Sequence, residues 1–228
     1  MGNEELDKIT EMLCTKSSLK QDVFKNTMDQ FQEMKKVAIN LVDKIKSNVC
    51  SKDDRIIIDY NEKSKYEFHI IIAGDILVFN LHSNVFKFDE NHSIWKTPYL
   101  QESEARGYTG IINVYNFLAD SFKYNRINDT GYLVGRLFVN NENNFYAEGK
   151  RTLSFLYNDF ANLKFEKEIM EDIIEKLMIH ILEFDLYTPQ YELVSEVSVH
   201  QIKTTGDSVQ IKTGKRMGFQ FQTDSKIE

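Results

Sequence analysis

Apolar residues recur at steps of three and four positions along the first 49 residues of the chain, which is the period of an amphipathic helix. The polar run Thr15–Ser18 interrupts this pattern, and Ser18 followed by Gln21 has the form of a helix capping box. These signals favour a short helix followed by a second, much longer one, and a single continuous helix is the alternative.

A long helix with one narrow apolar stripe is unstable by itself in water and has to pack against something. The stripe from Phe24 to Val49 can pack along the rest of the chain or against a copy of itself. The sequence does not choose between these arrangements. A homodimer or a partner protein bound through the N-terminal helix is therefore one expectation, and intramolecular packing is the other.

After residue 54 the apolar period changes to two, which indicates β-strands. A short strand is expected from Arg55 to Tyr60. Two longer strands, Tyr66–Ala73 and Ile76–Ser83, flank Gly74 and Asp75, a two-residue turn with glycine first, as a type II′ turn requires. The turn predicts three apolar pairs on one face of the hairpin: Phe68 with Leu81, Ile70 with Phe79, and Ile72 with Leu77.

The middle of the chain is harder to interpret. The segment from Val85 to Gly110 is a long polar loop, and loops of this length usually cover or gate something. Residues 111–122 fit a strand by their aromatic and branched content and a helix by their apolar spacing, and the helix is favoured.

A second hairpin is expected from Tyr132–Val139 and Phe145–Lys150 around the asparagine-rich loop 140–144. Pairing Val139 with Phe145 places Arg136 opposite Glu148 on one face. The other face is then predicted to be buried and to carry Leu133, Leu137, Val139, Phe145 and Ala147.

The clearest helix of the second half runs from Phe165 to about Leu186, and its broad apolar face predicts a central packing element against the sheet. Further strands are expected around Val197 and Val199 and from Met217 to Phe221. The predicted fold class is α+β, with an antiparallel β-sheet packed on a central helix and a long N-terminal helical arm. Residues 1–50 form the arm and residues 51–228 the α+β globular domain.

The overall charge argues against several classes of partner. The chain carries 28 Lys and Arg against 35 Asp and Glu, a net charge of -7, so neither nucleic acid nor anionic lipid is attracted by the protein as a whole. The N-terminus has the features neither of a secretory signal nor of a lipid anchor, and no apolar stretch is long enough to span a bilayer. A cytoplasmic protein that does not enter membranes is expected, and a nucleic acid or nucleotide partner is not favoured.

Three stretches carry a family resemblance: residues 121–132, Glu148–Arg151 and Lys215–Phe221. They resemble a pattern in uncharacterised bacterial hypothetical proteins, and the resemblance extends over residues 105–222. It implies a bacterial domain of that kind, and it implies no activity, cofactor or catalytic residue. The sequence also lacks the common nucleotide-binding, zinc-protease, hydrolase and CxxC motifs, so no cofactor is expected.

The predicted first hairpin gathers one set of metal-ligating residue types. Its outer face carries Glu67 opposite His82, with His69 on the same face. Two imidazoles and one carboxylate form the ligand set of many iron and zinc sites. A simple hydrogen bond between Glu67 and His82 on a polar sheet face explains the same pattern without a metal, and is preferred.

A second candidate set consists of Asp129, Glu148 and Lys150. An aspartate before a hairpin with E-x-K at its end is the outline of a nuclease core, in which carboxylates hold Mg²⁺ and the lysine steadies the attacking water. The predicted register places Asp129 on the face opposite Glu148 and Lys150 unless a bulge intervenes near Gly131. An ion pair between Arg136 and Glu148 is the simpler interpretation.

A third set is basic and suits a phosphate-bearing ligand. Its members are Lys123, Arg126, Arg151, Lys215 and Arg216. An ordinary solvated hairpin, with Phe219 and Phe221 in the core, is the preferred interpretation. The sequence as a whole favours a non-catalytic ligand-binding or protein-interaction module, with a regulatory role, and the alternative is a metal-dependent phosphodiesterase or nuclease using Asp129, Glu148 and Lys150.

Overall fold

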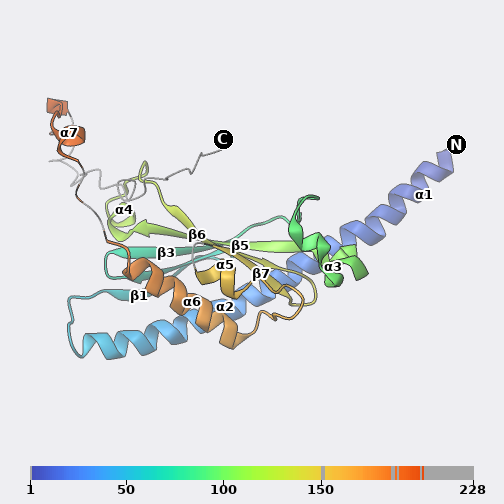
Figure 1. The fold of residues 1–228 in the computed structure, drawn as a ribbon, viewed down its shortest axis with the longest axis horizontal. Helices are drawn as coiled ribbons and strands as arrows, with labels where there is room; N and C mark the ends of the chain where they lie inside the picture. Colours follow the sequence, from blue (N-terminus) through green and yellow to red (C-terminus); the bar gives the residue numbers. More distant parts are fainter. Residues whose placement is uncertain (1, 150–151, 186–187, 189, 201, 203–228) are drawn as a thin grey trace, which may run out of the picture.

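The chain begins with one long helical element that projects beyond the rest of the molecule (Figure 1). The structure, a computed structural model, describes residues 2–149, 152–185, 188, 190–200 and 202. Helix α1 (Gly2–Met12) passes through a π-helical turn, η1 (Leu13–Ser17), into α2 (Ser18–Cys50) without leaving the helical conformation. The predicted division into two helices at Ser18 is therefore wrong. The polar residues stay within the helix because a side chain such as Thr15 donates to the Glu11 carbonyl at 2.7 Å instead of capping a new helix.

An antiparallel sheet follows, and its strands are ordered β1-β2-β3-β5-β6-β7 with the short β4 pairing beside β5. This confirms the predicted α+β class with its antiparallel sheet and long N-terminal helix. The strand bounds are β1 Ile58–Ser64, β2 Glu67–Ile72, β3 Asp75–Leu81, β4 Phe86–Lys87, β5 Tyr108–Leu118, β6 Tyr132–Val139 and β7 Phe145–Gly149.

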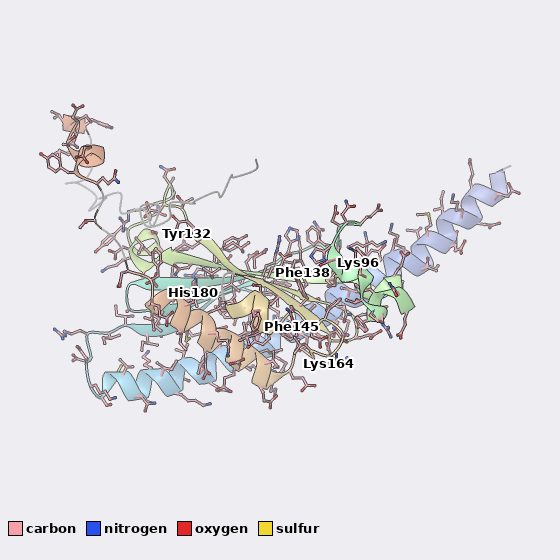
Figure 2. All side chains as sticks on the ribbon, in the orientation of Figure 1. Lys96, Tyr132, Phe138, Phe145, Lys164 and His180 are labelled. Atoms are coloured by element: carbon pink, nitrogen blue, oxygen red, sulfur yellow. The ribbon has the colours of Figure 1, made fainter. Side chains whose placement is uncertain are left out.

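Helices α2 and α6 (Lys167–Leu182) cover one face of this sheet (Figure 1). The aromatic rings at the centre of the core come from three elements: Phe31 of α2 lies 5.3 Å from Phe68 of β2, which stacks at 4.5 Å on Phe79 of β3. Figure 2 shows Phe145 of β7 on the side of the sheet where α6 lies. Residues 18–50 thus share one hydrophobic core with the sheet, so the stripe of α2 is satisfied by intramolecular packing.

The first hairpin forms as predicted, but its register differs by two residues. Phe68 pairs with Phe79 and Ile70 with Leu77, because the turn residues are Ala73 and Gly74 rather than Gly74 and Asp75. Ala73 has a φ of 52°, the left-handed value that the first position of this turn requires. A shift of two residues preserves the side-chain alternation, so the predicted apolar residues still share the buried face.

The second hairpin has the predicted register, with Val139 opposite Phe145 and Arg136 opposite Glu148. One predicted core residue is wrong: Leu133 is exposed and Val134 is buried instead. The cause is an irregularity in the β5–β6 ladder, where Val114 pairs with Gly135 and the next residue pairs with Leu133. This skips Val134 and reverses the alternation of β6 before that point.

Residues 111–122 are wrongly predicted as helical, since Tyr108–Leu118 is the central strand β5 and only Ala119–Lys123 forms a short helix, α4. The error has a physical cause. Ile112 belongs to the core under α2 and α6, whereas Ile111 belongs to a second cluster on the opposite face. A strand buried on both faces has no clean period of two.

The segment between β4 and β5 builds that second cluster. It contains two short 3-10 helices, η2 (Ser93–Lys96) and η3 (Glu104–Gly107), and the helix α3 (Pro98–Glu102). Ile94 of η2 belongs to this cluster, and the Phe88 ring lies 5.0 Å from the Phe138 ring. The long loop therefore covers part of the outer face of the sheet, where it buries Phe88, Ile94, Leu100, Ile111, Phe138 and Phe160.

The end of the described chain differs from the prediction. Helix α5 (Thr152–Leu156) precedes α6, which ends at Leu182 rather than near Leu186. The strand expected around Val197 and Val199 is wrong, because α7 (Tyr191–Val194) and a helical turn that includes Val199 occupy this region. The strand expected from Met217 to Phe221 lies outside the described residues.

Candidate functional site

The predicted metal ligands do not form one group. Glu67 pairs with Asn80 and His69 with Val78, whereas His82 lies beyond the end of β3 and accepts a hydrogen bond from the Asn84 amide at 3.0 Å. Because the register is shifted, only Glu67 and His69 interact, at 2.8 Å. Across the described part of the chain, no three His, Cys, Asp or Glu side chains are grouped so that they could hold a metal ion.

His69 is nevertheless an unusual residue, since it is buried on the outer face of β2. Its ring packs edge-on against Phe122 of α4 at 5.2 Å. Burial lowers the pKa of His69 below its ordinary value, and this effect outweighs the opposing effect of the Glu67 carboxylate. The neutral ring is therefore favoured, and it fastens α4 to the sheet.

The predicted carboxylates are held by two different partners. Glu148 pairs with Arg136 across the strands, with Nε to Oε2 at 2.9 Å, as the simpler interpretation expected. Asp129 accepts from the Ser121 hydroxyl at 2.7 Å and lies 3.4 Å from Arg126 Nε. Arg136 lies about 13 Å along β6 from Tyr132, and Asp129 lies before that strand begins, so the fold does not bring the two carboxylates together. Lys150 lies outside the described residues.

The predicted basic set is only partly described. Arg126 is buried beside Asp120 and Asp129, so its guanidinium serves the loop after α4 rather than an open site. Lys123 is exposed, and its ammonium lies 5.1 Å from the Tyr124 ring. Arg151, Lys215 and Arg216 lie outside the described residues.

A row of polar side chains crosses the outer face of the sheet. The strand registers place these residues directly opposite one another on five consecutive strands: Glu67, Asn80, Asn113, Arg136 and Glu148. We call this set the outer-face row. At the usual strand spacing it spans roughly 19 Å. Sequence reasoning named Glu67 and paired Arg136 with Glu148, but it did not align Asn80 and Asn113 with them, because the order of the strands could not be predicted.

The outer-face row presents polar groups of three kinds. It offers amides, a guanidinium and carboxylates, and no nucleophile lies beside a base within it. Arg136 lies 5.2 Å from the Phe138 ring while pairing with Glu148. Tyr146 lies next to this pair, and burial together with the Glu148 charge raises the pKa of its phenol. The side chains of the row can both donate and accept hydrogen bonds.

A cleft of about 620 Å³ lies on the opposite side, between α2, the β6–β7 loop and the start of α6. Its charged groups are engaged within the fold: Lys167 lies 3.5 Å from Glu33, and Lys164 donates to the Glu142 carbonyl at 2.9 Å. Burial raises the pKa of Glu142, but hydrogen bonds from Arg106 and Tyr99 outweigh burial and lower it. These contacts are those of a structural ion-pair network.

A stripe of exposed apolar side chains runs along α1 and the π-helical turn. Leu6, Ile9, Met12 and Leu13, which we call the α1 seam, are 60%, 55%, 49% and 59% exposed. Their spacing places them along one side of the helix. Figure 1 shows α1 projecting past the end of the sheet, away from α6. In the part of the chain that the structure describes, the seam lies outside the hydrophobic core that buries the apolar face of α2.

Among the helices within the described residues, none is both long and apolar enough to cross a bilayer. The chain matches no protein-family model, no curated protein and no solved structure. The resemblance to bacterial hypothetical proteins and the cytoplasmic location stay predictions. The function has to be argued from the α1 seam, the outer-face row and the side chains around them.

Proposed function

We propose that this protein is a non-catalytic interaction module that associates through the α1 seam with a helix of a second copy or of a partner protein. The observation that carries the proposal is the exposure of four large apolar side chains on one helix that lies outside the hydrophobic core. A helix with such a stripe is stabilised by packing against another helix.

The difference in burial between α1 and α2 supports this proposal. The residues of α2 that face the sheet, such as Phe31 and Met34, are fully buried. By contrast, every described side chain of α1 is exposed. The chain thus extends its helix beyond the length that its own core covers, and the extension keeps an apolar stripe. A helix end that is surrounded by solvent is typically polar on all sides, so an apolar stripe there indicates a binding partner.

The test compares association before and after the seam is made polar. We expect association to be abolished in a triple variant that combines Leu6→Gln, Ile9→Gln and Leu13→Gln. The control is Ile57→Gln, which alters an equally exposed apolar residue outside the helix and should leave association unchanged. Sedimentation measures self-association, and affinity capture followed by binding measurements with purified candidates tests partner proteins. If the triple variant associates as the unaltered protein does, the proposal is wrong.

The alternative function is a metal-dependent phosphodiesterase or nuclease that uses Asp129, Glu148 and Lys150. Its support is weaker, since Asp129 and Glu148 have separate partners in Arg126 and Arg136. Incubation with DNA and RNA in Mg²⁺ or Mn²⁺ tests it directly. Cleavage that is lost in both Asp129→Asn and Glu148→Gln, with the circular dichroism spectrum retained, would establish the alternative.

A further inference from the structure

We infer that the occupant of the α1 seam is a second copy of this chain and that the two helical extensions pair in an antiparallel orientation. This inference rests on the proposed function and adds the identity and direction of the partner. It is drawn from the distribution of charge along the exposed part of the helix and from the length of that part.

The charge of the helical extension, residues 2–20, changes sign along its length. Acidic residues occupy its first part, and basic residues occupy its second part. The acidic side chains are Glu4, Glu5, Asp7 and Glu11, with Lys8 among them, and the basic side chains are Lys16 and Lys20. Within the described residues, none of these side chains forms an ion pair with the rest of the chain.

Orientation decides whether these charges attract or repel. Two parallel copies would bring acidic ends together and basic ends together. Two antiparallel copies bring Glu4, Glu5 and Asp7 of each helix alongside Lys16 and Lys20 of the other. Charge complementarity of this kind selects partner and direction in paired helices.

The apolar spacing supports the same arrangement. Leu6 and Leu13 are one heptad apart, and so are Ile9 and Lys16. Facing Ile9 of one helix with Leu13 of the other places Leu6 opposite Lys16 of the second copy. The methylene stem of Lys16 can then cover Leu6, while its ammonium reaches the acidic residues that flank that leucine.

The overlap fits the exposed length. In this pairing the first helical residue, Gly2, lies opposite Lys20 of the second copy. Lys20 is where the helix meets the body, since its ammonium lies 5.9 Å from the Tyr108 ring of β5. Each extension therefore pairs with the other along its whole length, up to the point where the second copy's helix joins its own β-sheet. The overlap from Gly2 to Lys20 is about 27 Å long at the rise of an α-helix. Because an interface of this length is short, we expect the dimer to be reversible.

Sedimentation equilibrium of the full chain tests the inference, over about 1–200 μM protein and in a Cys14→Ser, Cys50→Ser background that excludes disulfide exchange. The expected result is a reversible dimer. Lys16→Glu with Lys20→Glu should raise its Kd at least about tenfold. Adding Glu4→Lys, Glu5→Lys and Asp7→Lys, which exchanges the charges of the two halves, should restore the Kd to within about threefold. Lys25→Glu is the matched control and should have little effect, because Lys25 lies after the extension.

The outcomes separate this inference from the proposed function. A monomer at every concentration overturns the inference and leaves only a different partner protein for the seam. A dimer that resists the polar seam variant overturns the proposed function itself. The antiparallel orientation is overturned if the dimer depends on the seam but its Kd is unchanged by the two lysine substitutions. It is also overturned if exchanging the charges fails to restore the Kd. Circular dichroism of each variant establishes that the helix is retained.

Discussion

The ammonium of Lys35 lies 2.7 Å from Oε1 of Glu62, and this contact fastens the β1–β2 hairpin to helix α2. The two partners differ in environment, since the Lys35 side chain is 4% exposed and the Glu62 side chain is 51% exposed. Lys35 also donates to the carbonyls of Ser64 at 2.9 Å and Lys65 at 3.3 Å. One lysine on the buried side of the helix thus holds the end of the strand and the turn that follows it.

Lys35 should therefore contribute more to stability than its carboxylate partner. Lys35→Ala is expected to lower the free energy of unfolding by about 2 kcal/mol, because it removes the buried stem and three hydrogen bonds. Lys35→Met keeps the apolar stem and should cost about 1 kcal/mol. Glu62→Gln should cost less than about 1 kcal/mol, since the pair is half solvated on that side. Urea unfolding measures all three, and an equal cost for Glu62→Gln and Lys35→Ala would contradict this account.

The tight turn of the first hairpin offers a stabilising substitution. Ala73 adopts a φ of 52°, a conformation that costs an L residue roughly 1–2 kcal/mol and costs glycine nothing. After the greater entropy of glycine in the unfolded chain is subtracted, Ala73→Gly should raise the free energy of unfolding by about 0.5 kcal/mol. Thermal and urea unfolding both report this change.

Gly74 provides the matched control for that turn. It does not adopt a positive φ, and a Cβ added there would meet no atom within 4 Å. Gly74→Ala is therefore expected to be neutral or slightly stabilising, by up to about 1 kcal/mol. A large loss of stability in Gly74→Ala together with a loss in Ala73→Gly would show that the turn lies one residue later along the chain, as the sequence alone suggested.

Protonation of His69 should destabilise the fold. Burial lowers its pKa below the ordinary value of 6.5, so the unfolded chain binds more protons than the folded chain in the window just below that pH. The contribution of His69 is present above pH 6.5 and is lost as the pH falls toward the lower pKa of the folded state. In His69→Gln this contribution is absent. The difference in unfolding free energy between the two proteins should thus shrink from pH 8 to pH 5, and parallel pH profiles would be evidence against a depressed pKa.

Close contact between α2 and β5 depends on one glycine. A Cβ at Gly110 would lie 2.3 Å from Oγ1 and 2.7 Å from Cβ of Thr27. Gly110→Ala should therefore push the helix away and cost about 2–3 kcal/mol. Combining it with Thr27→Ala, which removes two of the three clashing atoms, should recover part of that loss. A double-mutant cycle from urea unfolding is expected to show a coupling of about 1 kcal/mol, and additive costs would mean that the two backbones do not meet here.

The sequence by itself determined the parts of this protein that local pattern controls. The N-terminal helix, both hairpins, the pairing of Arg136 with Glu148 and the helix after Phe165 all follow from periodicity and turn chemistry over neighbouring residues. The α+β class follows from the same pattern. Both hairpins could be predicted because a short loop joins their strands, but only the second had the predicted register, since the first turn lies one residue earlier than expected.

Only the tertiary structure decided which distant elements pack together. Residues 111–122 form the central strand because helices cover one of its faces and the folded-back loop covers the other, a condition that local propensity does not contain. The same packing leaves α1 exposed and buries one face of α2, although apolar residues recur at helical spacing in both. It also aligns Asn80 and Asn113 in the outer-face row, since cross-strand neighbours depend on strand order and not on sequence distance. Apolar patterning specifies that a surface must be covered, and only the assembled fold determines what covers it.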